Sequence, residues 1–139
     1  MTPDDLRQRT KSFALDVIRL FRGLSRSEPA AVLGKQLLRA GTSVGANYRA
    51  VCRPKSDADF VSKMGTVIEE CDESAFWLEL LVDSGCVPAS HTRTLAKEAD
   101  ELIRIFVASR ETARRRIRAK RRARRASVEN HESRIMNHE

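Results

Sequence analysis

The side chains with the strongest chemical character lie near the C-terminal end of the sequence. Between residues 114 and 125, nine of twelve residues are arginine or lysine and none is acidic. Such a run attracts polyanions, because its like charges create a strong positive field. The run has no aromatic residue, so we expect contacts with phosphates rather than bases, and little dependence on base sequence. The candidate nucleic-acid-binding residues are Arg114, Arg115, Arg116, Arg118, Lys120, Arg121, Arg122, Arg124 and Arg125.

A cluster of carboxylates near the middle of the sequence is the second place where chemistry could occur. Paired carboxylates serve as acid–base catalysts and as metal ligands. Di-iron helical bundles require a histidine three residues after a glutamate, and no histidine of this chain has that position. We therefore expect no enzymatic activity, no metal and no cofactor. The acids should form a solvated or salt-bridged face made of Glu69, Glu70, Asp72, Glu73 and Glu79.

The cysteines and the hydropathy pattern bear on the compartment of the protein. The chain has an odd number of cysteines, and no two of them form a C-x-x-C motif. This favours reduced thiols that fill small core positions, at Cys52, Cys71 and Cys86. No apolar run approaches the ~20 residues that cross a bilayer, and the N-terminus lacks the apolar region of a signal peptide. We expect a soluble cytoplasmic protein with no membrane partner.

The elements that must position these side chains are helices. The chain has 139 residues, of which 41% are hydrophobic and 32% charged, with only 4 prolines and 5% aromatic residues. Apolar residues recur at steps of three and four, which is typical of amphipathic helices. Breaks near residues 25–28, at Pro54 and at Gly85 divide the chain into four helical segments. The pattern predicts an all-α protein, an antiparallel up-down-up-down four-helix bundle with a basic C-terminal extension.

The charge distribution separates a bundle from its extension. Residues 111–139 contain ten basic and four acidic side chains, whereas residues 1–110 are nearly neutral with a net charge of +1. We predict a bundle over residues 1–112, followed over residues 113–139 by an Arg-rich helical extension and a tail that is disordered from Ser127. Repulsion among like charges is the reason for expecting disorder there.

Two further groups of residues indicate close contacts between helices or subunits. The segment 75–82 is apolar nearly all round, which implies a second packing surface. We assign an oligomer interface to Phe76, Trp77, Leu80 and Leu81. Trp77 could instead be a stacking platform for bases. Two glycines four residues apart are costly in a helix. They indicate either a kink or a close helix crossing at Gly41, Gly45 and Asn47.

The sequence around these glycines resembles a known family. The segment 36–49 reads Gln-Leu-Leu-Arg-Ala-Gly-Thr-Ser-Val-Gly-Ala-Asn-Tyr-Arg, and it is followed by residues 56–60, 70–73 and 77–81. Together these segments resemble the bacterial four-helix bundle family, also called S23 or 23S rRNA intervening-sequence proteins, over about residues 10–108. One departure is Ala50, where the family usually carries an acidic residue.

The resemblance implies an up-down bundle that assembles into a ring, commonly a homopentamer. It also implies similarity to accessory proteins of diversity-generating retroelements, which bind nucleic acid and a reverse transcriptase. The resulting hypothesis is a non-enzymatic homo-oligomer that binds RNA or DNA through basic residues, as an accessory to a reverse transcriptase or another nucleic-acid-processing protein. The alternative is a protein-interaction scaffold whose basic extension only aids solubility.

Overall fold

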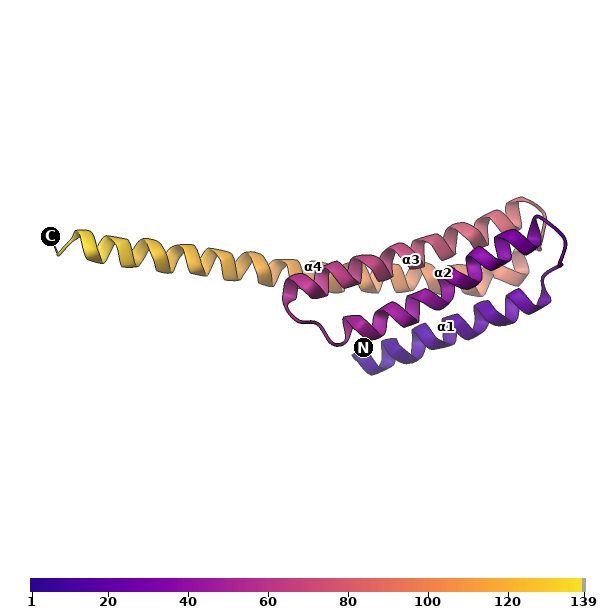
Figure 1. Cartoon of the computed structure of the whole chain (residues 1–139), viewed down its shortest axis with the longest axis horizontal. Coiled ribbons are helices and arrows are strands. Elements are labelled where there is room, and N and C mark those ends of the chain that lie inside the picture. The colour runs from indigo at the N-terminus through magenta and orange to yellow at the C-terminus, as the bar shows by residue number, and fades with distance from the viewer. Residues whose placement is uncertain (139) are drawn as a thin grey trace.

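Four helices account for most of the chain. The computed structural model describes residues 1–138 and contains α1 (Pro3–Gly23), α2 (Ala30–Val51), α3 (Asp57–Asp83) and α4 (Ala89–Met136). Successive helices run in opposite directions, and α4 continues far beyond the other three (Figure 1). This part of the chain contains no strand. The predicted all-α, antiparallel four-helix bundle is therefore confirmed.

The helices form a closed square in cross-section. α1 contacts α2 and α4, and α3 contacts the same two helices, whereas α1 and α3 lie diagonally across the bundle without contacting each other. The centre is filled by fully buried apolar side chains from all four helices, including Phe13, Leu37, Met64 and Phe106. Burial of each such side chain contributes roughly 1.5–3 kcal/mol, which makes this core the main source of stability.

Local signals explain where the helices begin. The Thr2 hydroxyl accepts a hydrogen bond from the Asp5 amide, and the Asp5 carboxylate accepts one from the Thr2 amide. This reciprocal capping box satisfies two backbone donors at the start of α1. At the start of α3, the Ser56 hydroxyl accepts from the Asp59 amide at 3.0 Å. The turn after α3 contains Gly85, whose positive φ of 78° suits a residue without a side chain.

α1 and α2 approach each other closely at the glycines of α2. A Cβ placed on Gly41 would lie 2.8 Å from Cγ2 of Val17, so the bare backbone is required there. A Cβ on Gly45 would lie 3.4 Å from the Thr10 carbonyl oxygen, which is a looser approach. α2 continues through both glycines as one helix.

The C-terminal part of α4 departs from the sequence-based expectation. The last fully buried residue is Ala113, and beyond it α4 projects from the end of the bundle (Figure 1). The expected disorder from Ser127 is wrong for the residues up to Met136, which are helical. Alanine, arginine and glutamate have high helix propensity, and Glu129 and Glu132 place opposite charge after the basic run. Glu139, the last residue of the expected tail, lies outside the described residues.

Candidate nucleic-acid interface

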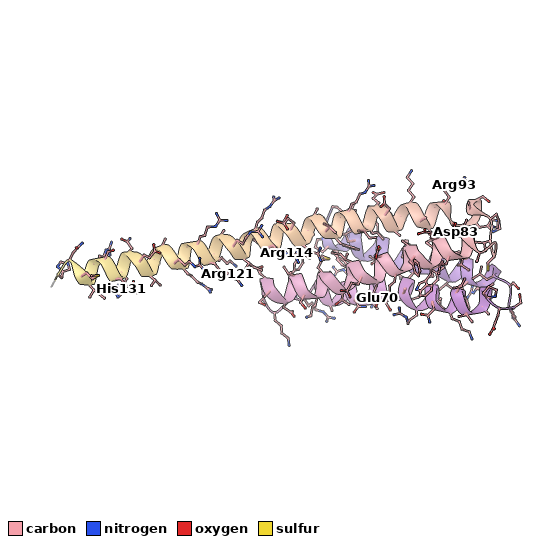
Figure 2. The ribbon with its side chains drawn as sticks, turned by 90° about the horizontal axis from the view of Figure 1, so that it is seen from above. Glu70, Asp83, Arg93, Arg114, Arg121 and His131 are labelled. Atoms are coloured by element: carbon pink, nitrogen blue, oxygen red, sulfur yellow. The ribbon has the colours of Figure 1, made fainter. Side chains whose placement is uncertain are left out.

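The basic residues lie on the segment of α4 that leaves the bundle. Figure 2 shows Arg114 where α4 passes the end of α3, and Arg121 on the projecting part. The side chains of all nine candidate residues are exposed. The α4 helix therefore presents them to solvent, and the remaining question is which of them the protein already uses for its own ion pairs.

Two of the nine residues are bound to the bundle through Asp57, the first residue of α3. Lys120 Nζ lies 2.8 Å from Asp57 Oδ2, and an Arg116 guanidinium nitrogen lies 3.6 Å from Asp57 Oδ1. The hydrogen bond from Lys120 lowers the pKa of Asp57, and the charges of both cations add to the effect. These contacts fix the first turns of the extension against the end of α3.

Two more of the nine residues are paired within α4. Arg118 donates to Glu111 Oε1 at 2.9 Å, and Arg115 Nε lies 3.8 Å from the same oxygen. The hydrogen bond from Arg118 lowers the pKa of Glu111. Both pairs are exposed to solvent, where such interactions are weak and readily exchanged for another anion.

The other five basic residues have no ion pair among the described residues. A helix repeats every 3.6 residues, so steps of four, three and four place Arg114, Arg118, Arg121 and Arg125 on one face. This arginine stripe covers twelve residues, and its end residues lie about 16 Å apart along the helix axis. Arg122 lies beside it, whereas Arg116 and Lys120 lie on the face nearer the bundle. The stripe is the part of the candidate site best placed to meet a polyanion.

The residues assigned to an oligomer interface divide into two groups. Phe76 is 51% exposed, and Trp77 and Leu80 are partly exposed, so these three are accessible on α3. The rings of Phe76 and Trp77 lie 5.2 Å apart, and the Trp77 indole N–H is covered without a hydrogen-bond partner among the described residues. The assignment of Leu81 is wrong, because its side chain is fully buried in the core of its own subunit.

The third residue of the glycine segment has a local role. Asn47 donates a hydrogen bond to the Ser43 carbonyl at 2.9 Å, one turn earlier in α2. Its amide group therefore satisfies a bond within its own helix rather than one to another helix. Nothing else in the structure assigns a role to Asn47.

The same segment has the G-x-S-x-G spacing of a hydrolase nucleophile, but not its geometry. A nucleophile elbow exposes its serine on a tight turn between a strand and a helix. Here Gly41 to Gly45 lie in the middle of α2, and the Ser43 hydroxyl donates to the Arg39 carbonyl at 2.7 Å. The segment is therefore part of a continuous helix and does not form a nucleophile elbow.

The carboxylates of α3 are divided between ion pairs and solvent. Arg39 of α2 pairs with Glu70 and Glu73, so part of the acidic face is salt-bridged, whereas Lys63 pairs with Asp59. Arg49, another basic residue of α2, makes no ion pair within the described residues. No group of histidine, cysteine, aspartate or glutamate side chains in residues 1–138 has the geometry of a metal site.

Sequence reasoning missed the intramolecular partners of the basic run. The Glu111–Arg115 pair has the i, i+4 spacing of helix ion pairs and could have been found from the sequence. Asp57 lies 63 residues before Lys120, and only the bundle brings the two together. Among the described residues, none of the helices combines the length and hydropathy that a bilayer crossing requires.

Comparison with known proteins places this arrangement in a family. A solved structure from Bacteroides thetaiotaomicron VPI-5482, described as a protein of unknown function from the S23 ribosomal protein family, is similar at a TM-score of 0.69 and 28% identity. The match covers 74% of this chain and 95% of that chain. A search of curated proteins finds no match. The family model named 23S rRNA-intervening sequence protein matches residues 4–108. Because that match covers most of the chain, the protein belongs to the 23S rRNA-intervening sequence protein family.

Proposed function

We propose that this protein is a non-enzymatic homo-oligomer that binds RNA or DNA through the α4 extension, as an accessory to a nucleic-acid-processing enzyme. The observation that carries the proposal is the arginine stripe of α4. It projects beyond the bundle, and apart from Arg118 its members have no carboxylate partner among the described residues. The association of the family's name with 23S rRNA intervening sequences agrees with a nucleic-acid role.

The expected binding is electrostatic. Arginine binds phosphate through bidentate hydrogen bonds and stays charged at all physiological pH values. If the stripe and its neighbours neutralise about six phosphates of a duplex, log K should fall with log salt at a slope near −5. In an oligomer several extensions can contact one nucleic acid together, and avidity then strengthens binding by ~10²-fold or more.

The test compares two variants that lose the same charge from the same helix. In the stripe variant, Arg114, Arg121 and Arg125 become Gln. In the control, Arg93, Lys97 and Arg104 of the bundle part of α4 become Gln. Binding to a 20-nucleotide RNA and to a DNA duplex is measured by fluorescence anisotropy from 0.05 to 0.5 M salt.

The proposal expects a stripe-specific loss of binding. On the duplex, the slope of log K against log salt should become less negative by ~2.7 for the stripe variant, because three phosphate contacts are lost, and should change little for the control. Equal slopes for the two variants would refute the site. If the native chain bound neither the RNA nor the DNA duplex, the scaffold alternative would be the better account.

A further inference from the structure

The bundle is electrically neutral only as an average. Residues 1–56, which include α1 and α2, contain eleven basic and four acidic side chains, a net charge of +7. Residues 57–112, which include α3 and the bundle part of α4, contain five basic and twelve acidic side chains, a net charge of −7. One half of the bundle is therefore strongly basic and the other half is strongly acidic.

A stripe of α1 that faces away from the core combines basic and apolar side chains. Steps of four, four, three and four residues place its members on one side of the helix, opposite the buried Phe13 and Val17. Leu15 is 41% exposed, and neither Lys11 nor Arg22 has an ion pair among the described residues. The basic stripe consists of Arg7, Lys11, Leu15, Ile18 and Arg22.

The outward face of α3 carries the opposite arrangement. Four carboxylates flank the exposed Phe76 at steps of three and four residues, and Leu80 lies one turn beyond it. None of these four carboxylates has an ion pair among the described residues, although the chain has more basic than acidic side chains. The acidic stripe consists of Glu69, Asp72, Phe76, Glu79, Leu80 and Asp83.

The two stripes have similar lengths, and in each the apolar side chains lie between charged ones. The basic stripe covers sixteen residues and the acidic stripe fifteen, so their end residues lie about 22 Å and about 21 Å apart along the helix axis. Laid parallel with their apolar centres together, they place Leu15 against Phe76. Basic side chains then meet acidic ones on both flanks, at Lys11 with Asp72 and at Arg22 with Asp83.

We propose that the acidic stripe of α3 in one subunit binds the basic stripe of α1 in the next copy of this chain. An apolar centre with a charged rim is the usual composition of a specific interface, and the complementary charges fix its register. This proposal rests on the homo-oligomer proposed above and names the surfaces that would form it. It retains Phe76 and Leu80 of the interface assigned from the sequence.

The positions of the stripes determine the kind of assembly. α1 and α3 lie diagonally across the bundle, so the stripes face opposite directions and one subunit cannot pair both with a single partner. Each subunit must then bind two neighbours through two different surfaces. Such head-to-tail contacts produce a closed ring, or a filament if the rotation between subunits does not close.

Charge reversal tests the contact without disturbing the fold, because the four side chains changed are exposed and unpaired among the described residues. The α1 variant carries Lys11→Glu and Arg22→Glu, and the α3 variant carries Asp72→Lys and Asp83→Lys. A third chain carries all four changes. The control, Arg49→Glu with Lys97→Glu, has the same charge change as the α1 variant outside both stripes. Mass is measured by light scattering over a concentration series, and helicity by circular dichroism.

The proposal expects a specific loss and recovery of assembly. The native chain and the control should form the same multimer. The α1 and α3 variants should dissociate toward the 15.7 kDa subunit at concentrations at least tenfold higher. The fourfold variant should regain the native mass, because its stripes are again complementary.

Other outcomes would overturn the contact. A multimeric native chain whose α1 and α3 variants keep their mass would refute these surfaces and leave the proposed homo-oligomer intact. Loss of RNA binding by the α1 variant with no change of mass would identify the basic stripe as a polyanion surface instead. A native chain that is monomeric at all concentrations would refute the homo-oligomer and this contact together. Binding through the α4 extension is measured separately and can stand in every case.

Discussion

Gly41 of α2 packs directly against the side chain of Val17 of α1, and this contact can be tested. In Gly41→Ala the new Cβ would lie 2.8 and 3.0 Å from the two methyl carbons of Val17, which is fully buried and cannot move freely. We expect the free energy of unfolding to fall by about 1–3 kcal/mol, the usual cost of overpacking. Urea denaturation followed by circular dichroism measures it.

Gly65 supplies the matched control for this substitution. It lies inside α3, and nothing within 4 Å would meet a Cβ there. Gly65→Ala should stabilise the protein by about 0.5–1 kcal/mol, because alanine has the higher helix propensity. If both substitutions shifted stability in the same direction, the bare backbone at Gly41 would not be a requirement of the helix crossing.

The cysteines should differ in reactivity. Cys71 is fully buried, and its thiol donates a weak hydrogen bond to the Ala99 carbonyl. Burial raises the pKa of Cys71 to about 12, so almost no thiolate exists at pH 8. Cys52 and Cys86 are partly exposed. A chromogenic disulfide reagent should therefore label two thiols in the native protein and the third only in denaturant. Rapid labelling of all three would contradict the buried position of Cys71.

At this scale the sequence predicted residue types better than residue orientations. Apolar residues at steps of three and four predict a core stripe through Ala75 and Val82 on α3, whereas the buried positions continue through Ser74 and Leu81. Buried Ser74 obscured this register, since a polar residue is not expected in a core. Its hydroxyl is satisfied by the Glu70 carbonyl at 2.8 Å, so burial costs little. Because of this shift in register, the sequence pattern wrongly predicts an exposed position for Leu81.

The α4 helix is the element whose behaviour the sequence predicted least well. High helix propensity favours a helix along the extension, whereas repulsion among its like charges opposes one. Composition alone does not show which of the two effects is larger. The structure adds the tertiary contact of Asp57 with Lys120 and Arg116, which composition could not supply. By contrast, the four helices and their order followed directly from the apolar period and the breaks at proline and glycine.

The Asp57 contact should protect the first turns of the extension from hydrogen exchange. In Asp57→Asn the ion pairs with Lys120 and Arg116 are lost, so amides near residues 116–120 should exchange faster at pH 7. In the native chain the pKa of Asp57 is lowered. Its ion pairs therefore stabilise the folded state fully above the unfolded pKa of 3.8, and this stabilisation is lost as pH falls through the lower pKa of the folded state. Exchange across this pH range measures the effect.

Lys120→Gln is the control for that variant, because it removes the Lys120–Asp57 ion pair without changing the start of α3. Both variants should accelerate exchange in the same segment, and a change confined to α3 in Asp57→Asn would refute the contact. Asp57→Asn also frees two cations. If they bind phosphates, the salt slope for duplex DNA should steepen by up to ~1.8.

At the scale of the whole molecule, the distribution of charge between the two halves of the bundle is more informative than the net charge. The near-neutral bundle expected from the sequence consists of halves with charges of +7 and −7, and the described residues beyond Thr112 add further positive charge. The periodic sequence predicts which side chains share a helix face. Only the diagonal placement of α1 and α3 shows that the basic and acidic stripes point in opposite directions.

Assembly and nucleic-acid binding should therefore depend on separate parts of the chain, which a truncation can test. A chain that ends at Lys120 retains buried Ala113 and the contacts of Arg116 and Lys120 with Asp57. It lacks the four arginines between residues 121 and 125. Its oligomeric number and urea midpoint should equal those of the full chain, because neither the core nor the two stripes is changed.

The truncated chain should lose about four phosphate contacts with duplex DNA. Over the same salt series, its slope of log K against log salt should therefore become less negative by ~3.6. One control completes this test. The α1 charge-reversal variant in the full-length chain should lose assembly while each subunit keeps its extension, so its salt slope per subunit should persist while avidity falls. If the truncated chain instead became monomeric, the extension would be part of the subunit contact, and the assignment of assembly to the α1 and α3 stripes would be wrong.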